Sequence, residues 1–345
     1  MDASRNIWVD YAKAIGIILV VYGHVARGVL TQGLIINQDI YKIVDKIIYS
    51  FHMPLFFFLS GLFLIPSLTT RTVKNFLFGK FDTIIYPYIV WSLLQGLIEV
   101  ALSHYTNGHT TMSEVFSLAW IPRAQFWFLY VLFFIFVFAS LIYKQNSSEK
   151  WCAGIFAGSI LLYFFGGLLP YFYITSMLTH NLIYFSFGTL AAFTLKRYNE
   201  NGNWTFILLG AIVVFVLSQW IFQVSQGSRY NSAPGIILML AIIGIGSVVV
   251  ISHWLAQFNL PWLAYLGRHS MAIYLVHILA GSGCRIILLK LFGVTDVGIH
   301  LLLGTLCGLL LPVLFYWWCS RTGFNVLFFP PKLIQLRSTT RQQAT

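Results

Sequence analysis

Ten stretches of mostly apolar residues, each roughly 20 residues long, follow one another along the chain. A helix of about 20 apolar residues is long enough to cross the hydrocarbon core of a bilayer. The runs are continuous rather than alternating, which excludes the pattern of an outer-membrane β-barrel. The sequence therefore predicts an all-α, polytopic membrane helical bundle with about ten transmembrane helices, at residues 7–29, 47–65, 82–102, 125–143, 152–169, 177–195, 204–224, 234–252, 271–290 and 299–319.

Composition leads to the same class of protein. Of the 345 residues, 58% are hydrophobic and 9% are charged, whereas a soluble domain carries about 25% charged residues. A soluble fold and a disordered chain are both excluded. We expect one membrane domain over residues 1–329 and a short polar cytoplasmic tail over 330–345. The cysteines match no metal or redox spacing, so we expect them to pack as apolar residues and expect no metal site.

Basic residues are divided unevenly between the two sides of the predicted bundle. Thirteen fall in the termini and in the loops that follow even-numbered helices, against four or five in the other loops. Loops rich in Lys and Arg face the cytoplasm. The sequence therefore predicts that both termini are cytoplasmic. Most of the net charge of +11 then reports topology, and no nucleic-acid partner is expected.

The first apolar stretch carries ionisable residues on one face. Asp10 and Lys13 are neighbours on a helix because they are three residues apart. His24 returns to nearly the same face, about 16 Å further along the axis. Such groups normally face the interior of a bundle. An interfacial ion pair and a hydrogen-bonded interior histidine are the simpler interpretations, but together the three residues favour a polar pocket in which His24 is a general base.

Further candidates for a site lie in three other apolar stretches. His52 lies in the second stretch at a depth similar to that of His24, and Ser60–Gly61 allows close helix approach. His277 lies one to two turns inside the ninth stretch. Trp127 and Tyr130 lie near the outer interface, where membership of an aromatic belt is the simpler interpretation.

Several predicted cytoplasmic cations are placed to bind an anionic ligand of the cytoplasm. Arg71 and Lys74 follow the second stretch, and Arg268 precedes the ninth. Basic loops are expected on this side from topology alone, so a ligand site here is a hypothesis that competes with a simpler one.

Four segments, in this order, resemble the membrane-bound acyltransferase-3 family. DYAKAIGIILVVYGH at 10–24 resembles its first-helix Arg-x10-His pattern, with Lys13 in place of the usual Arg. FHMPLFFFLSG at 51–61, FWFLYVLFF at 126–134 and LGRHSMAIYLVH at 266–277 are similar to later elements of the family. Lys13 together with FWFLY looks closer to the fucose-4-O-acetylase-like subgroup of glycan O-acetyltransferases.

The resemblance implies a membrane-embedded O-acetyltransferase of the bacterial inner (plasma) membrane. It would move an acetyl group from cytoplasmic acetyl-CoA to a hydroxyl of a cell-surface glycan or of its lipid-linked precursor. His24, Asp10 and Lys13 would be catalytic, with His24 as general base or as acyl relay. The donor would bind Lys13, Arg71, Lys74 and Arg268, and the acceptor would contact His52, Ser60, Trp127, Tyr130 and His277.

Two other classes of function use the same features. A proton-coupled transporter or flippase of a glycan-related substrate would also carry His24 in the membrane, although no inverted repeat is visible. A scaffold protein of a glycan pathway would tolerate replacement of His24. Slow hydrolysis of acetyl-CoA by the purified protein would favour the transferase. The sequence predicts no oligomeric state and does not identify the sugar.

Overall fold

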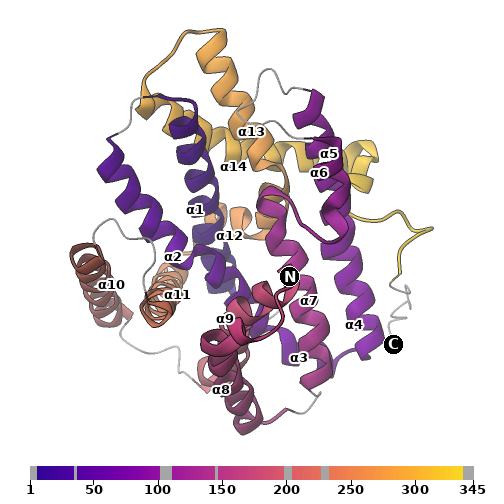
Figure 1. The fold of residues 1–345 in the computed structure, drawn as a ribbon, viewed down its shortest axis with the longest axis vertical. Coiled ribbons are helices and arrows are strands. Elements are labelled where there is room, and N and C mark those ends of the chain that lie inside the picture. The colour runs from indigo at the N-terminus through magenta and orange to yellow at the C-terminus, as the bar shows by residue number, and fades with distance from the viewer. Residues whose placement is uncertain are drawn as a thin grey trace. The chain divides into compact units, whose positions relative to one another are not determined.

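A computed structural model describes residues 6–34, 37–101, 111–143, 147–197, 204–226 and 233–336. Within these ranges the chain is helical and contains no strand, which confirms the all-α prediction (Figure 1). The α-helices are α1 (Ile7–Thr31), α2 (Gln38–Leu62), α3 (Leu64–Thr69), α4 (Val73–Lys80), α5 (Tyr86–Ala101), α6 (Met112–Phe116), α7 (Trp127–Ile142), α8 (Glu149–Phe165), α9 (Tyr173–Arg197), α10 (Trp204–Gln226), α11 (Pro234–Ala256), α12 (Pro261–Arg268), α13 (Ser270–Lys290) and α14 (Val297–Thr322).

Nine helical stretches of the described residues are long and apolar enough to cross a membrane. They correspond to nine of the ten predicted spans, so the chain is a polytopic helical membrane protein. The remaining predicted span, 177–195, forms α9, which is long enough but more polar. Thr179, His180 and Asn181 lower its hydropathy. The cytoplasmic location of both termini stays a prediction.

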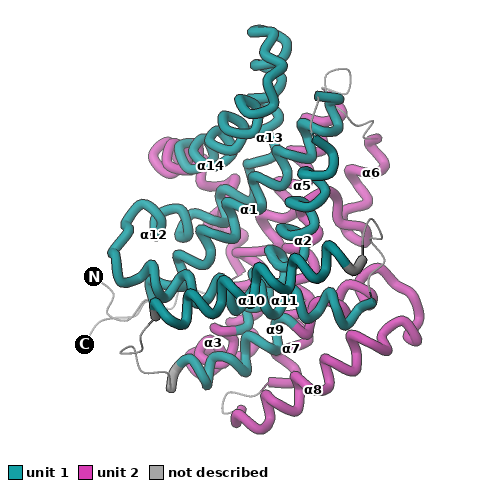
Figure 2. Tube along the Cα trace, turned by 90° about the vertical axis from the view of Figure 1, so that its left-hand side faces the viewer, with its two compact units in different colours: residues 1–61, 184–314 teal, residues 62–183, 315–345 magenta. Residues whose placement is uncertain are grey.

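The helices form two compact units, which Figure 2 colours separately. Unit 1 comprises Met1–Gly61 and Tyr184–Leu314, and unit 2 comprises Leu62–Ile183 and Phe315–Thr345. The expected single domain over 1–329 and tail over 330–345 stay a prediction, and residues 337–345 of that tail lie outside the described residues.

In unit 1, α1 packs against α11, α12 and α13. The short helix α12 begins at Pro261. Proline suits the first helical turn, because a backbone N–H at that position would have no partner within the helix. Tyr11 and Ala14 of α1 form a buried apolar cluster with Leu263 and Ala264 of α12. The hydroxyl of Tyr11 accepts a hydrogen bond of 2.6 Å from the backbone N–H of Leu260. These contacts fix α12 at the start of α1.

Small residues bring α2 and α9 together, also in unit 1. A Cβ atom on Gly61 would overlap the backbone carbonyl of Phe185, and one on Gly188 would overlap the carbonyl of Phe58. The two backbones are therefore in direct contact, as in other membrane helix pairs with small residues at the interface. This confirms the close approach predicted at Ser60–Gly61.

In unit 2, the C-terminal segment is held against the helical stretch 73–101. This stretch contains a π-helical turn, η1 (Phe81–Ile85), between α4 and α5. The indole of Trp91 donates a 2.7 Å hydrogen bond to the carbonyl of Leu327, and the carboxylate of Asp82 accepts one of 3.1 Å from the N–H of Leu336. Backbone groups beyond α14 thus find partners on side chains of unit 2.

Candidate active site

Histidines from three helices of unit 1 lie close together. The rings of His24 on α1 and His277 on α13 are 5.2 Å apart between centroids. On α2, the ring of Tyr49 lies against Gly23, next to His24, and meets the ring of His52, which brings His52 to the same region. His52 and His277 are almost fully buried, whereas His24 is partly exposed. The structure thus brings together three histidines that are far apart in sequence, and it leaves His24 accessible.

Backbone hydrogen bonds fix the protons of the two buried histidines. Nδ1 of His52 lies 2.8 Å from the carbonyl oxygen of Ile48, and Nδ1 of His277 lies 2.8 Å from that of Tyr274. A carbonyl can only accept, so each Nδ1 carries the proton, and in the neutral ring each Nε2 carries a lone pair. Nε2 of His277 is buried and has no hydrogen-bond partner among the described residues. In its neutral form each ring can therefore act as a base through Nε2.

Arg27 links α1 to α2 beside these histidines. Its guanidinium makes two hydrogen bonds to the carboxylate of Asp45, at 2.8 and 2.9 Å. The same guanidinium stacks 3.3 Å above the ring of Tyr49, and that ring meets His52 edge-on with centroids 4.5 Å apart. We call Arg27, Asp45 and Tyr49 the arginine clamp. A bidentate ion pair and a cation–π contact together restrict the rotamers around His52.

In unit 1, the residues predicted to bind the acetyl donor, Lys13 and Arg268, lie near the start of α1. Asp10 is buried, Lys13 is partly buried, and both make contacts with other groups. Gly267 of α12 lies against the backbone of Asp10, so the exposed Arg268 comes to the same end of α1 as Lys13. The order along α1 is therefore Asp10 and Lys13 first, and His24 about 16 Å further on.

Four predicted site residues belong to unit 2. Arg71 is exposed before α4, and Lys74 is exposed on α4 with its ammonium 5.5 Å from the ring of Phe78. Trp127 begins α7, and the hydroxyl of Tyr130 donates a 3.0 Å hydrogen bond to the carbonyl of Ala119. Ser60, in unit 1, donates to the carbonyl of Phe56 one turn earlier in α2. The hydroxyls of Tyr130 and Ser60 thus have local backbone partners.

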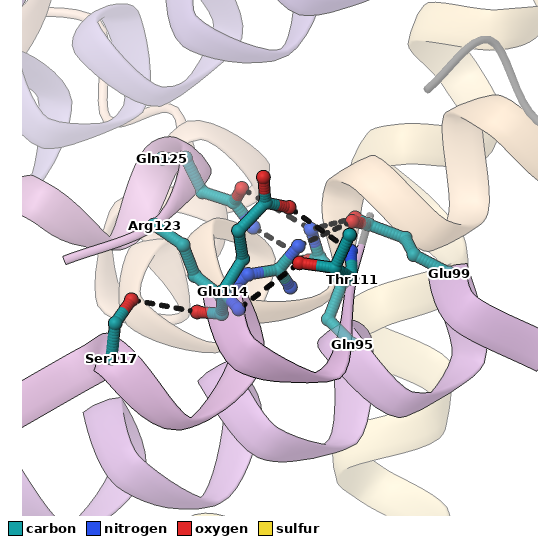
Figure 3. A network of polar contacts seen from close by, with 7 residues as sticks. All are labelled: Gln95, Glu99, Thr111, Glu114, Ser117, Arg123 and Gln125. Carbon is teal, nitrogen blue, oxygen red and sulfur yellow. Dashed lines mark hydrogen bonds and ion pairs between the residues drawn. The ribbon is translucent and has the colours of Figure 1, made fainter. Parts of the chain in front are cut away.

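A polar network fastens the segment before α7 to α5 in unit 2 (Figure 3). Arg123 pairs with Glu99 at 2.6 Å, and the side-chain amide of Gln125 donates a 2.7 Å hydrogen bond to Gln95. A capping box of Thr111 and Glu114 starts α6. The segment 111–125 is therefore anchored to unit 2 by polar contacts, and residues 102–110 lie outside the described residues.

Comparison with known protein families decides the class of the chain. A sequence model of the family described as "Acyltransferase domain" matches residues 6–321. The chain belongs to this family. The acyltransferase-3 resemblance inferred from the four sequence segments is thereby confirmed at the level of the family. The matched range contains the three histidines, the arginine clamp and the start of α1.

Two curated relatives of this acyltransferase-family chain carry the name "Nodulation protein NolL". The protein from Sinorhizobium fredii is 27% identical over 197 residues, which cover 56% of this chain and 50% of the relative. The protein from Mesorhizobium japonicum is 24% identical over 218 residues, which cover 62% of this chain and 56% of the relative. The match thus spans about half the length of each relative. No solved structure matches the chain.

Sequence reasoning missed the arginine clamp and Arg285. The count of charged residues contained a signal for Arg27 and Arg285. Lys13, Arg27 and Arg285 are the basic residues left inside apolar stretches once the loop residues have been assigned to a side. Asp45 and Tyr49 gave no comparable signal, because a carboxylate and a tyrosine near a membrane interface are ordinary.

Proposed function

We propose that the chain is a membrane-embedded O-acetyltransferase that moves an acetyl group from acetyl-CoA to a hydroxyl of a glycan. One observation carries the proposal: His24, His52 and His277 converge from three helices inside unit 1 of an acyltransferase-family chain. Ionisable residues inside membrane helices are rare and generally functional. Acyl transfer to a hydroxyl needs a base, and a neutral histidine is the side chain suited to it near pH 7.

His24 is the residue proposed to act on the acceptor, because it is the accessible member of the cluster. Its ring nitrogen takes the proton of the acceptor hydroxyl as the oxygen attacks the thioester carbonyl carbon. The bond between that carbon and sulfur then breaks, and the protonated His24 returns the proton to the departing thiolate of coenzyme A. A relay through an acetyl-histidine would use the same residue as nucleophile. His277 and His52 are positioning residues around it.

The donor is proposed to approach from the Lys13 end of α1. Acetyl-CoA carries several phosphates, and Lys13 and Arg268 place two cationic side chains at that end. Lys13 supplies a point charge, which suits a phosphate without forming the forked contact that an arginine makes. Arg71 and Lys74 of unit 2 stay predictions for the same role, as does a catalytic role for Asp10.

The acceptor is proposed to be a cell-surface glycan or its lipid-linked precursor. The relatives' names point to nodulation, and the sequence elements to the fucose-4-O-acetylase-like subgroup. The bacterial inner membrane and cytoplasmic termini belong to the same proposal. Contacts of the acceptor with Trp127, Tyr130 and Ser60 stay predictions.

The proposal is tested with purified full-length chain in nanodiscs and acetyl-CoA labelled in its acetyl group. The His24→Ala variant is expected to bind acetyl-CoA as the unchanged chain does. Transfer of label to total host glycan should fall by about 100- to 10,000-fold, the usual contribution of a general base. Release of free coenzyme A should fall with it.

His180→Ala is the matched control, because His180 is an exposed histidine in the N-terminal part of α9, which belongs to unit 2. It should leave transfer unchanged. Full transfer by His24→Ala would sink the assignment of the base. Absence of both acetyl-CoA binding and coenzyme A release in the unchanged chain would sink the proposed function as a whole.

A further inference from the structure

Arg285 lies two turns beyond His277 on α13 and reaches back to α1. Eight residues separate Arg285 from His277, which is about 12 Å along the helix axis. Its guanidinium occupies the space above Gly28, where a Cβ atom would overlap Nη1. Gly28 is four residues after His24 on α1, so the two residues lie on neighbouring turns of one face. Arg285 therefore lies one turn from the proposed base.

The charge of Arg285 has no counterion among the residues that the structure describes. Its Nε is buried without a hydrogen-bond partner, and the side chain forms no ion pair with any residue that the structure describes. The contrast with Arg27 is direct, since that arginine is paired twice with Asp45. An unpaired guanidinium inside a membrane bundle is costly, and such residues commonly mark a ligand site.

The point at which Arg285 contacts α1 indicates which substrate it faces. Gly28 is 15 residues beyond Lys13, about 22 Å along the axis, and His24 lies between them. The cations proposed to hold the donor phosphates, Lys13 and Arg268, are at the far end of α1. An anion bound to Arg285 thus lies on the opposite side of His24 from those phosphates.

We infer that Arg285 binds a negatively charged group of the acceptor, either the carboxylate of an acidic sugar or the phosphate of a lipid-linked glycan. This inference rests on the proposed function, because it takes His24 as the point where the two substrates meet. A guanidinium suits both anions, since its planar fork matches pairs of oxygens. A side chain at Gly28 would displace the guanidinium from this position.

The experiment measures binding without turnover. Full-length chain in nanodiscs is titrated with methyl glucuronide, glucose 1-phosphate and the neutral methyl glucoside, by ligand-observed NMR. Arg285→Gln and Gly28→Ala should weaken binding of an anionic probe by about tenfold or more, as loss of a charge-assisted contact does. Arg285→Lys should retain more of the phosphate binding than of the carboxylate binding, because lysine keeps the charge and loses the fork.

Gly283→Ala is the matched control, because a Cβ atom at Gly283 of the same helix α13 meets no atom within 4 Å. It should bind all three probes as the unchanged chain does. Loss of binding cannot be attributed to unfolding if Arg285→Gln melts at the same temperature or higher, which is expected when an unpaired charge is removed.

The two anionic probes separate the two sources of the anion. Preference for methyl glucuronide indicates an acidic sugar, and preference for glucose 1-phosphate indicates a lipid-linked phosphate. Equal binding of neutral and anionic probes, or no binding of either anion, overturns the inference. Acetyl-CoA binding and coenzyme A release, measured on the same preparation, report separately on the proposed function.

Discussion

At the scale of single residues, the arginine clamp explains how His52 keeps its place beside His24. Tyr49 is held from one side by the guanidinium of Arg27 and touches His52 with its edge. Asp45 fixes that guanidinium with two hydrogen bonds. A charge network of this kind restricts rotamers even where it adds little stability, so its main effect should be on the geometry of the histidines.

Asp45→Asn tests this positioning role. The Arg27 side chain is 40% exposed and that of Asp45 is 11% exposed, so the pair lies between a surface and a buried ion pair. We expect the free energy of unfolding to fall by about 1 kcal/mol. The turnover number should fall about tenfold through misplacement of the base, with an unchanged KM for acetyl-CoA. Steady-state kinetics in nanodiscs measures both parameters.

Asp39→Asn is the control for this change, since Asp39 is an exposed carboxylate in the first turn of the same helix. It should alter neither parameter. If Asp45→Asn raised the KM for acetyl-CoA and left turnover intact, the clamp would belong to donor binding and not to the histidines.

The residues of the site differ in how far the sequence could predict them. Asp10, Lys13 and His24 share one helix, so their common face follows from helical spacing alone. The approach of His277 to His24 depends on how α13 packs against α1, which no local pattern encodes. His52 and His277 were candidates because of their positions inside apolar stretches, but no sequence pattern indicated the partners of Arg27 or the orphaned charge of Arg285.

At the scale of helices, hydropathy located the spans well, because a membrane imposes a fixed length of apolar sequence. The same reasoning missed α12, whose eight residues are too short to span a bilayer. Its place is set by tertiary contacts, with Leu263 and Ala264 packed on Tyr11 and Ala14. This short helix carries Arg268, which we propose to bind the donor, to the start of α1.

The contact between α2 and α9 gives a prediction at this scale. Gly61→Ala and Gly188→Ala each force a methyl group into a backbone carbonyl of the facing helix. The helices must separate, at a cost of about 1–3 kcal/mol or more. We expect lower melting temperatures in detergent and loss of activity in proportion, since α2 carries His52 and the arginine clamp.

Gly210→Ala is the control for the glycine substitutions. Gly210 lies within α10, and a Cβ atom there meets nothing within 4 Å. It should leave the melting temperature unchanged or raise it, because alanine favours a helix over glycine by up to about 1 kcal/mol. Equal losses in all three variants would show that the α2–α9 contact is not special.

At the scale of the whole molecule, α1 and α13 run in the same direction within unit 1. His24 meets His277, Val25 lies against Gly281, and Gly28 lies against Arg285, so both residue numbers rise together. Two spans that cross in the same direction must be separated by an odd number of crossings. An even number of the nine apolar stretches lies between α1 and α13. If α9 also crosses the membrane, the number of crossings between them becomes odd.

The parallel packing of α1 and α13 predicts that α9 crosses the membrane despite its polar residues, and that the chain has ten spans. Tyr171 lies before α9 and Gln257 after α11, and both are exposed. With α9 as a span, three helices separate them and they face opposite sides. A membrane-impermeant maleimide should therefore label Tyr171→Cys in intact bacterial cells and Gln257→Cys only after permeabilisation. The unsubstituted chain measures the background of the four native cysteines, of which Cys152 and Cys319 are buried.

The labelling result bears directly on the proposed chemistry. With the expected orientation, Lys13 and Arg268 face the cytoplasm, where acetyl-CoA is found, and Arg285 faces the outer side. Labelling of both cysteines under one condition would mean that α9 does not cross, and the parallel packing of α1 and α13 would then need another explanation. Labelling of Gln257→Cys alone in intact cells would invert the molecule, and the donor would have to reach His24 from the Arg285 end.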